Sequence, residues 1–194
     1  MTKSELRKIF REKRNRLSIE EQRLLNENLL EQFKTIDWSN YSYVHVYLPL
    51  TKFNEPDTSN LLNWLRQYHP HLKLVISKSN FDTGELLHYE LKAETKLVEN
   101  NYGILEPMNG VLVDEKLLDV VLVPLLVVDC FGNRIGYGKG FYDRFLLKCR
   151  KDVKSYGVSF FEPVELISDV GEWDVRLTNL ITPERLYSFN KKQP

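Results

Sequence analysis

The most hydrophobic segment of the chain, residues 118–129, limits most strongly which folds are open to it. Residues 120–128 are aliphatic apart from Pro124, and the run stays well short of the ~20 residues that a membrane-spanning helix needs. A strand that is apolar at consecutive positions buries both of its faces, which is typical of a mainly parallel sheet covered by helices. The run therefore predicts the central strand of such a sheet.

Helical and extended patterns alternate along the rest of the chain. Residues 3–35 have the period of two helices, and Ser18 with Glu21 forms a capping-box signature where the second helix begins. Further helices are expected at residues 57–68 and 141–149, and further strands at residues 44–48, 72–77, 86–91, 155–160 and 177–182, with 86–91 at an edge. This order predicts an α/β fold: a three-layer open, mainly parallel sheet with helices on both faces. The 194 residues fit a single domain, 1–194.

Charge is balanced overall but unevenly distributed. The first 16 residues carry seven basic and two acidic side chains, so the remainder is net acidic by five. The basic residues Lys3, Arg7, Arg11 and Arg14 share one face of the first predicted helix. Such an excess suits a nucleic acid, a membrane or the phosphates of a small ligand. A nucleic-acid site needs a broad basic patch with stacking aromatics, which the acidic remainder does not offer, so we expect neither a nucleic-acid nor a membrane partner.

Two cysteines, Cys130 and Cys149, have neither the spacing of a disulfide framework nor that of a metal site. Charged residues occupy the N-terminal positions where a secretory signal would place an apolar segment. Both observations predict a cytoplasmic protein.

A glycine-rich loop follows the apolar run and carries the strongest functional signal. Its glycines are Gly132, Gly136, Gly138 and Gly140. Loops after parallel strands are common ligand sites, and backbone N–H groups at a helix N-terminus suit phosphate oxygens. Lys139 adds a positive charge, and Asp143 offers oxygens to Mg²⁺, although an acid in a first helical turn also simply complements the helix dipole. The spacing matches neither a Walker A loop nor a dinucleotide fingerprint.

Residues 133–144, Asn-Arg-Ile-Gly-Tyr-Gly-Lys-Gly-Phe-Tyr-Asp-Arg, resemble the signature of the 5-formyltetrahydrofolate cyclo-ligase family, also called methenyltetrahydrofolate synthetase. Residues 3–7, 47–58 and 102–107 are similar to three further family segments in the same order. The resemblance thus covers nearly the whole chain. Phe141 stands where many members have tyrosine, and Pro56 is an unusual neighbour for Glu55.

The resemblance implies a reaction that uses ATP and Mg²⁺. Members of the family convert 5-formyltetrahydrofolate into 5,10-methenyltetrahydrofolate with release of ADP and phosphate. The formyl oxygen attacks the γ-phosphate, N10 of the folate then closes the ring, and phosphate leaves.

The resemblance also assigns residues. ATP is expected at Lys3, Ser4, Glu5, Leu6, Arg7, Arg134, Ile135, Gly136, Tyr137, Gly138, Lys139, Gly140, Phe141 and Tyr142. The folate is expected at Leu50, Glu55, Phe141 and Tyr142. The catalytic residues would be Lys139, Arg134 and Tyr142, and the Mg²⁺ ligands Asp143 and Asp174.

Structural alternatives remain open for several of these residues. Tyr142 would serve equally as core, and Arg134 as the partner of a carboxylate that holds the loop in shape. Asp129 has two possible roles, to approach the metal or, as the acid at a strand end, to orient the loop. Two other functions also remain open: a non-catalytic folate-binding protein, and an unrelated α/β enzyme for phosphosugars or nucleotides. We expect a monomer whose partners are small molecules, ATP and a reduced folate.

Overall fold

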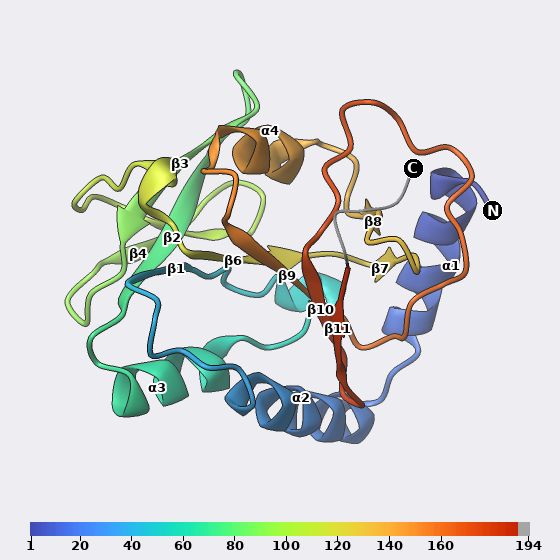
Figure 1. The fold of residues 1–194 in the computed structure, drawn as a ribbon, viewed down its shortest axis with the longest axis horizontal. Coiled ribbons are helices and arrows are strands. Elements are labelled where there is room, and N and C mark those ends of the chain that lie inside the picture. Colours follow the sequence, from blue (N-terminus) through green and yellow to red (C-terminus); the bar gives the residue numbers. More distant parts are fainter. Residues whose placement is uncertain (190–194) are drawn as a thin grey trace.

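A seven-stranded sheet forms the centre of the computed structural model, which describes residues 1–189 (Figure 1). The strands lie in the order β11 (Leu186–Ser188), β10 (Asn179–Ile181), β9 (Lys154–Val158), β6 (Val120–Pro124), β1 (Tyr43–His45), β2 (Lys73–Asn80) and β3 (Glu85–Glu90). From β10 to β2 all neighbours are parallel, whereas β11 and β3 are antiparallel edges. The prediction of a mainly parallel open sheet, with the segment after residue 85 at an edge, is confirmed.

Helices cover both faces of this sheet (Figure 1). The helices are α1 (Lys3–Asn15), α2 (Ile19–Lys34), α3 (Ser59–Tyr68) and α4 (Phe141–Lys148), with 3-10 turns η1 (Thr51–Phe53) and η2 (Glu115–Leu117). Helices α2 and α3 pack on one face and α4 on the other. None of the helices within residues 1–189 combines the length and apolar character needed to span a membrane.

Two hydrophobic cores, one on each face of the sheet, explain the apolar run. On β6, Val120 and Leu122 join the core under α2 and α3, while Val121 and Val123 join the core under α4. Successive side chains of a strand point to opposite faces, so a strand covered on both sides has to be apolar at every position. The central position of this strand is therefore a direct consequence of its sequence.

The apolar run was predicted to form one strand, but in the structure it is divided. Strand β6 ends at Pro124, which lacks the N–H needed to continue the ladder. The chain then forms β7 (Val127–Val128), which pairs antiparallel with β8 (Arg134–Ile135). The glycine loop consequently projects from this small hairpin, on which Leu6 and Phe10 of α1 pack.

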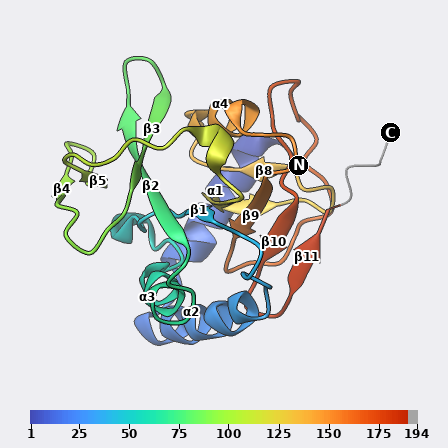
Figure 2. The same cartoon turned by 60° about the vertical axis from the view of Figure 1, so that its left-hand side comes forward.

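Besides β8, three further short strands lie outside the sequence prediction. One is the edge strand β11, and the others are β4 (Leu97–Glu99) and β5 (Leu105–Pro107), which form a two-stranded sheet of their own. Figure 2 shows this pair at the margin of the molecule, next to β2 and β3. The pair matters for function because the turn between its strands borders the main cavity.

Replacing Gly157 in β9 by alanine is expected to destabilise the fold by about 1–3 kcal/mol, because it overpacks a core without free space. The added Cβ would lie 2.5 Å from Leu125 Cδ2 and 2.6 Å from Leu177 Cδ1, and both leucines are buried. Urea unfolding of the variant measures the loss. Gly136→Ala is the matched control, since an added Cβ there meets no atom within 4 Å. Equal unfolding midpoints for the two variants would contradict the packing argument.

Candidate active site

A cavity of about 590 Å³ opens at the carboxyl ends of β1 and β6. From β1 the chain continues to β2 on one side, whereas β6 leads to β9 and β10 on the other. Adjacent loops therefore diverge at this point, which is where open α/β sheets characteristically bind ligands. The segments that follow the two strands supply much of the wall.

Most of the residues predicted for the site line this cavity. They are Lys3, Arg7, Leu50, Glu55, Arg134, Ile135, Gly136, Tyr137, Gly138, Lys139, Gly140, Phe141, Tyr142, Asp143 and Asp174. Ser4, Glu5 and Leu6 are not among the lining residues. Leu6 is buried against the β7–β8 hairpin, and Glu5 accepts a 2.9 Å hydrogen bond from the Thr2 N–H in the cap of α1. A role for these three in ATP binding stays a prediction from their segment.

The glycine loop presents backbone and one free ammonium group to the cavity. Gly138 and Gly140 have φ of +89° and +69°, a left-handed conformation that side chains disfavour, and α4 begins directly after them. Arg7 of α1 holds the loop by donating from Nε to the Gly136 carbonyl at 3.1 Å. The Lys139 ammonium has no hydrogen bond or ion pair within the described residues, so it is available to an anionic ligand.

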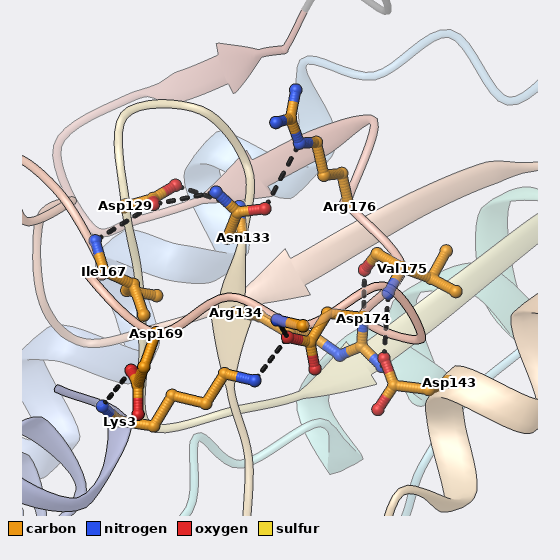
Figure 3. Close-up of polar contacts among 11 residues, drawn as sticks. Lys3, Asp129, Asn133, Arg134, Asp143, Ile167, Asp169, Asp174, Val175 and Arg176 are labelled. Carbon is orange, nitrogen blue, oxygen red and sulfur yellow. Dashed lines mark hydrogen bonds and ion pairs between the residues drawn. The ribbon is translucent and has the colours of Figure 1, made fainter.

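Arg134 and Asp143 form a largely enclosed ion pair under the loop (Figure 3). The Arg134 side chain is only 5% exposed and donates from Nη2 to Asp143 Oδ1 at 2.7 Å. The Val175 N–H donates to the same oxygen at 3.0 Å, and the Val175 carbonyl accepts from Arg134. Burial lowers the pKa of the guanidinium, an effect that Asp143 opposes. The pair therefore ties the loop and the start of α4 to the segment before β10.

The start of α1 is attached to the same segment. The Lys3 ammonium pairs with Asp174 Oδ2, and the Lys3 N–H donates to Asp169 Oδ1 at 2.6 Å (Figure 3). The Ser168 N–H donates to the Met1 carbonyl at 3.0 Å. Although burial alone raises it, the pKa of Asp174 is held below its usual value, chiefly by Lys3 and a backbone N–H. These contacts fix the start of α1 beside the cavity, which Lys3 and Asp174 both line.

Asp129 organises the loop from beneath. It is fully buried, and its carboxylate accepts from the N–H of Phe131 and of Asn133 and from the Asn133 amide, each at 2.9 Å. It also accepts from the Ile167 N–H at 3.2 Å (Figure 3). With these partners Asp129 is an orienting residue for the β7–β8 turn, which was one of the two roles left open by the sequence.

Glu55 is a buried carboxylate on the opposite wall. It is 7% exposed, with Oε1 accepting from the Tyr137 hydroxyl at 2.5 Å and Oε2 accepting from the Leu50 N–H at 2.7 Å. Burial raises its pKa, although these donors and the nearby Arg14 oppose the shift. A buried carboxylate beside a cavity is a strong acceptor for the N–H groups of a ligand.

The Glu55→Gln variant is expected to gain stability relative to wild type as the pH rises above 4.5. In wild type the folded-state pKa lies above the usual 4.5, so the folded state binds more protons than the unfolded state in the window above that value. Its free energy of unfolding therefore falls with rising pH through that window, whereas glutamine does not titrate. Urea unfolding of both proteins between pH 4.5 and 8 measures the difference, and parallel pH profiles would contradict the raised pKa.

Two features of the cavity had no counterpart in the sequence prediction. The first is an aromatic wall in which Phe81 stacks on Tyr102 with ring centroids 4.0 Å apart and meets Phe141 edge-on at 5.3 Å. These rings come from the β2–β3 turn, the β4–β5 turn and α4. Tyr102 belongs to one of the family-like segments, but nothing in the sequence places Phe81 beside it.

The second is a serine between two histidines on the cavity floor. Ser77 Oγ lies 2.7 Å from His45 Nε2 and 2.9 Å from His88 Nδ1. Burial lowers the pKa of His45 well below its usual value and that of His88 to about 4, so both rings are neutral at neutral pH. The three residues lie on three adjacent strands, and their proximity depends on the sheet register.

Fold and cavity together define an α/β enzyme with a small-molecule site at the topological switch point of its sheet. The sequence profile of the 5-formyltetrahydrofolate cyclo-ligase family matches residues 1–183, and the chain belongs to this family.

Relatives from several bacteria agree with this placement. The chain is 27% identical over 186 residues to the 5-formyltetrahydrofolate cyclo-ligase of Escherichia coli K12, covering 93% of this chain and 100% of that protein. It is 31% identical over 147 residues to the Mycolicibacterium smegmatis cyclo-ligase, covering 73% and 74%. The solved structure of Aquifex aeolicus 5,10-methenyltetrahydrofolate synthetase matches with a TM-score of 0.84 at 28% identity, covering 100% of this chain and 96% of that one.

Proposed function

We propose that the protein converts 5-formyltetrahydrofolate and ATP into 5,10-methenyltetrahydrofolate, ADP and phosphate, with Mg²⁺ as cofactor. One observation carries the proposal. The four family-like segments, which are far apart in the sequence, all contribute to one cavity through residues such as Lys3, Glu55, Tyr102 and Lys139. A cavity of about 590 Å³ falls within the range of small-molecule sites.

The glycine-loop side of the cavity suits the triphosphate of ATP. The N-terminal end of α4 and the loop offer backbone N–H groups, and Lys139 and Arg7 offer positive charge.

In the proposed reaction, the formyl oxygen forms a bond to the γ-phosphorus as the bond to the ADP oxygen breaks. N10 then bonds to the formyl carbon, loses its proton, and the carbon–oxygen bond breaks to release phosphate. Positioning and charge neutralisation dominate phosphoryl transfer, and we assign both to Lys139, Arg7 and the N–H groups of the glycine loop.

Asp143 and Asp174 fit Mg²⁺ as two carboxylates beside the phosphate site. Arg134 and Val175 bind one oxygen of Asp143, and Lys3 and Gly171 bind one oxygen of Asp174, so the second oxygen of each carboxylate is free of these partners. Within residues 1–189 no group of three acidic, histidine or cysteine side chains is arranged to hold a metal. This fits Mg²⁺, which protein sites commonly hold through one or two carboxylates plus substrate phosphates and water. Bound there, the ion would neutralise charge on the triphosphate.

The opposite side of the cavity suits the folate. The aromatic wall of Phe81, Tyr102 and Phe141 offers flat apolar surface to a pterin or aminobenzoyl ring, and Glu55 offers a buried acceptor for ring N–H groups. Tyr142 packs near His45 and lines the cavity, and burial raises the pKa of its hydroxyl, which keeps it neutral. We assign Tyr142 to the boundary between the two ligands and Arg134 to the support of the loop.

Incubation with 5-formyltetrahydrofolate, ATP and Mg²⁺ tests the proposal directly. The near-ultraviolet absorbance of the methenyl product should rise in step with ADP, and omission of ATP or Mg²⁺ should abolish both signals. Folate binding without ADP would instead indicate a non-catalytic folate-binding protein. Nucleotide binding without stabilisation by folate in a thermal-shift assay would indicate unrelated chemistry at the same loop.

We further propose that residues 1–194 act as one cyclo-ligase domain and as a monomer in the cytoplasm. Cytoplasmic location is supported by the free thiols of Cys130, which is exposed, and Cys149.

A further inference from the structure

We propose that Tyr137 is a positioning residue that couples the two ligands, so that nucleotide at the glycine loop tightens the binding of folate at Glu55. The inference rests on the proposed function, because it takes the loop as the nucleotide side and Glu55 as the folate side. It concerns a chain of contacts from Arg7 through Tyr137 to Glu55, with Arg14 as its fixed point.

The Tyr137 side chain reaches from the glycine loop to the segment after β1. Its hydroxyl donates to Glu55 Oε1 at 2.5 Å, and its ring stacks on Phe53 with centroids 5.1 Å apart and an interplanar angle of 28°. Both partners belong to the stretch 51–55, whose η1 turn borders the cavity. One side chain therefore joins the two walls to which ATP and folate are assigned.

Arg7 controls the backbone on either side of this tyrosine. Its Nε donates to the Gly136 carbonyl at 3.1 Å, and a Cβ built on Gly138 would lie 3.6 Å from the guanidinium carbon. Arg7 also lines the cavity, where it is one of the cations assigned to the triphosphate. A phosphate that recruits this guanidinium competes with the Gly136 carbonyl for it, and the backbone that carries Tyr137 is then released.

Arg14 is the residue in this series of contacts that keeps its position. It is 0% exposed, and it donates to the Leu125 carbonyl as well as to the Tyr137 hydroxyl, the latter at 3.1 Å. A buried guanidinium is held in place by the cost of exposing its carbonyl partner and its own charge without hydrogen bonds. When the loop shifts, Arg14 keeps its position. The Tyr137 hydroxyl then moves away from both Arg14 and Glu55.

The consequence falls on the Glu55 carboxylate. Without the phenol it loses its donor on Oε1 while remaining buried, and a buried acceptor without a donor is costly. An N–H group of the folate restores the hydrogen bond. Nucleotide binding therefore makes the free energy of folate binding more favourable. By linkage, folate must tighten nucleotide binding by the same factor. The size of one hydrogen bond to a charged group corresponds to a coupling of about tenfold.

Titration calorimetry of the full chain tests the coupling. The dissociation constant of 5-formyltetrahydrofolate is measured with and without the non-hydrolysable analogue β,γ-imido-ATP plus Mg²⁺. In wild type the analogue should lower this constant about tenfold. In Tyr137→Phe the ratio should fall to between one and two, because folate affinity without nucleotide rises toward the nucleotide-bound value. Tyr187→Phe is the matched control. Tyr187 lies on the edge strand β11 and its hydroxyl donates to Glu162, so the ratio in this variant should equal that of wild type.

Each other outcome overturns the inference. Independent binding of both ligands to wild type, or an unchanged ratio in Tyr137→Phe, leaves the proposed function intact and removes the coupling. Equal losses of both affinities in Tyr137→Phe, with the ratio preserved, would show a purely structural role. If the variant is too unstable to titrate, Glu55→Ala provides the same measurement, because it removes the acceptor that receives the Tyr137 hydroxyl, and a wild-type ratio there rejects the coupling. Failure of wild type to bind either ligand rejects the proposed function and the inference together.

Discussion

If the proposed ATP-dependent reaction holds, replacement of Lys139 by alanine is expected to lower its kcat by about a hundred- to a thousandfold, the usual effect of removing one donor to developing charge. Lys139 lines the cavity and its ammonium has no protein partner within the described residues, so its charge is wholly available to the transferring phosphoryl group. Because phosphoryl transfer depends on charge neutralisation in the transition state, the loss should fall mainly on kcat.

Initial rates of methenyl absorbance at saturating folate measure this effect. Lys148→Ala is the matched control, since Lys148 lies on α4 just after the loop and its ammonium is engaged at the surface with Glu85 at 2.6 Å. That variant should keep its rate within about twofold, as expected for an exposed ion pair. Retention of most activity in Lys139→Ala would remove the lysine from the reaction. A selective loss of folate affinity would mean that the two sides of the cavity are exchanged.

Asp129→Ala is expected to lower the free energy of unfolding by roughly 3–5 kcal/mol, because several donors lose a buried acceptor at once. These donors include the Phe131, Asn133 and Ile167 N–H groups, and the carboxylate that they share is fully buried. For a chain of this length the loss corresponds to a fall in Tm of about 10 °C. Activity should fall with it, since Arg134 follows directly in the same hairpin.

Urea unfolding monitored by circular dichroism measures the loss. Asp37→Ala is a suitable control, because Asp37 also accepts from a following residue, the Ser39 N–H at 3.0 Å and hydroxyl at 2.7 Å, but at an exposed turn. Its effect should stay below about 1 kcal/mol. Similar losses in the two variants would show that burial of Asp129 does not determine its contribution.

Elements defined by local signals were predictable from the sequence. The capping box of α2 is one: Ser18 and Glu21 satisfy each other's backbone N–H groups, and this depends only on residues three apart. Helix α4 begins directly after Gly140, as its pattern indicated. Likewise, the apolar run correctly marked the strand that is covered on both faces.

Elements defined by distant partners were not predictable. Residues 118–129 are as apolar as a single long strand, and only the pairing of β7 with β8 separates them from β6. Strand β11 exists because Asn179, Leu180 and Ile181 offer it an edge. The short strands β4 and β5 likewise have too few residues for a periodic signal.

The same distinction applies to the site. Family-like segments located the cavity because most of its wall comes from them. The roles of individual side chains within it depend on contacts that no spacing encodes. Arg14 was expected on one face with Lys3 and Arg7, yet it is fully buried and bonded to Tyr137. No sequence pattern pairs Tyr137 with Glu55, which lies 82 positions earlier.

The attachment of Met1 and Lys3 to residues 168–174 has a practical consequence for producing the protein. The Met1 carbonyl and the Lys3 backbone N–H are both engaged, so a polypeptide fused ahead of Met1 would begin two residues from Lys3, which lines the cavity. An affinity tag left at that end is expected to impair use of the nucleotide while leaving the fold intact. Kinetic constants should therefore be measured on protein from which any N-terminal tag has been removed.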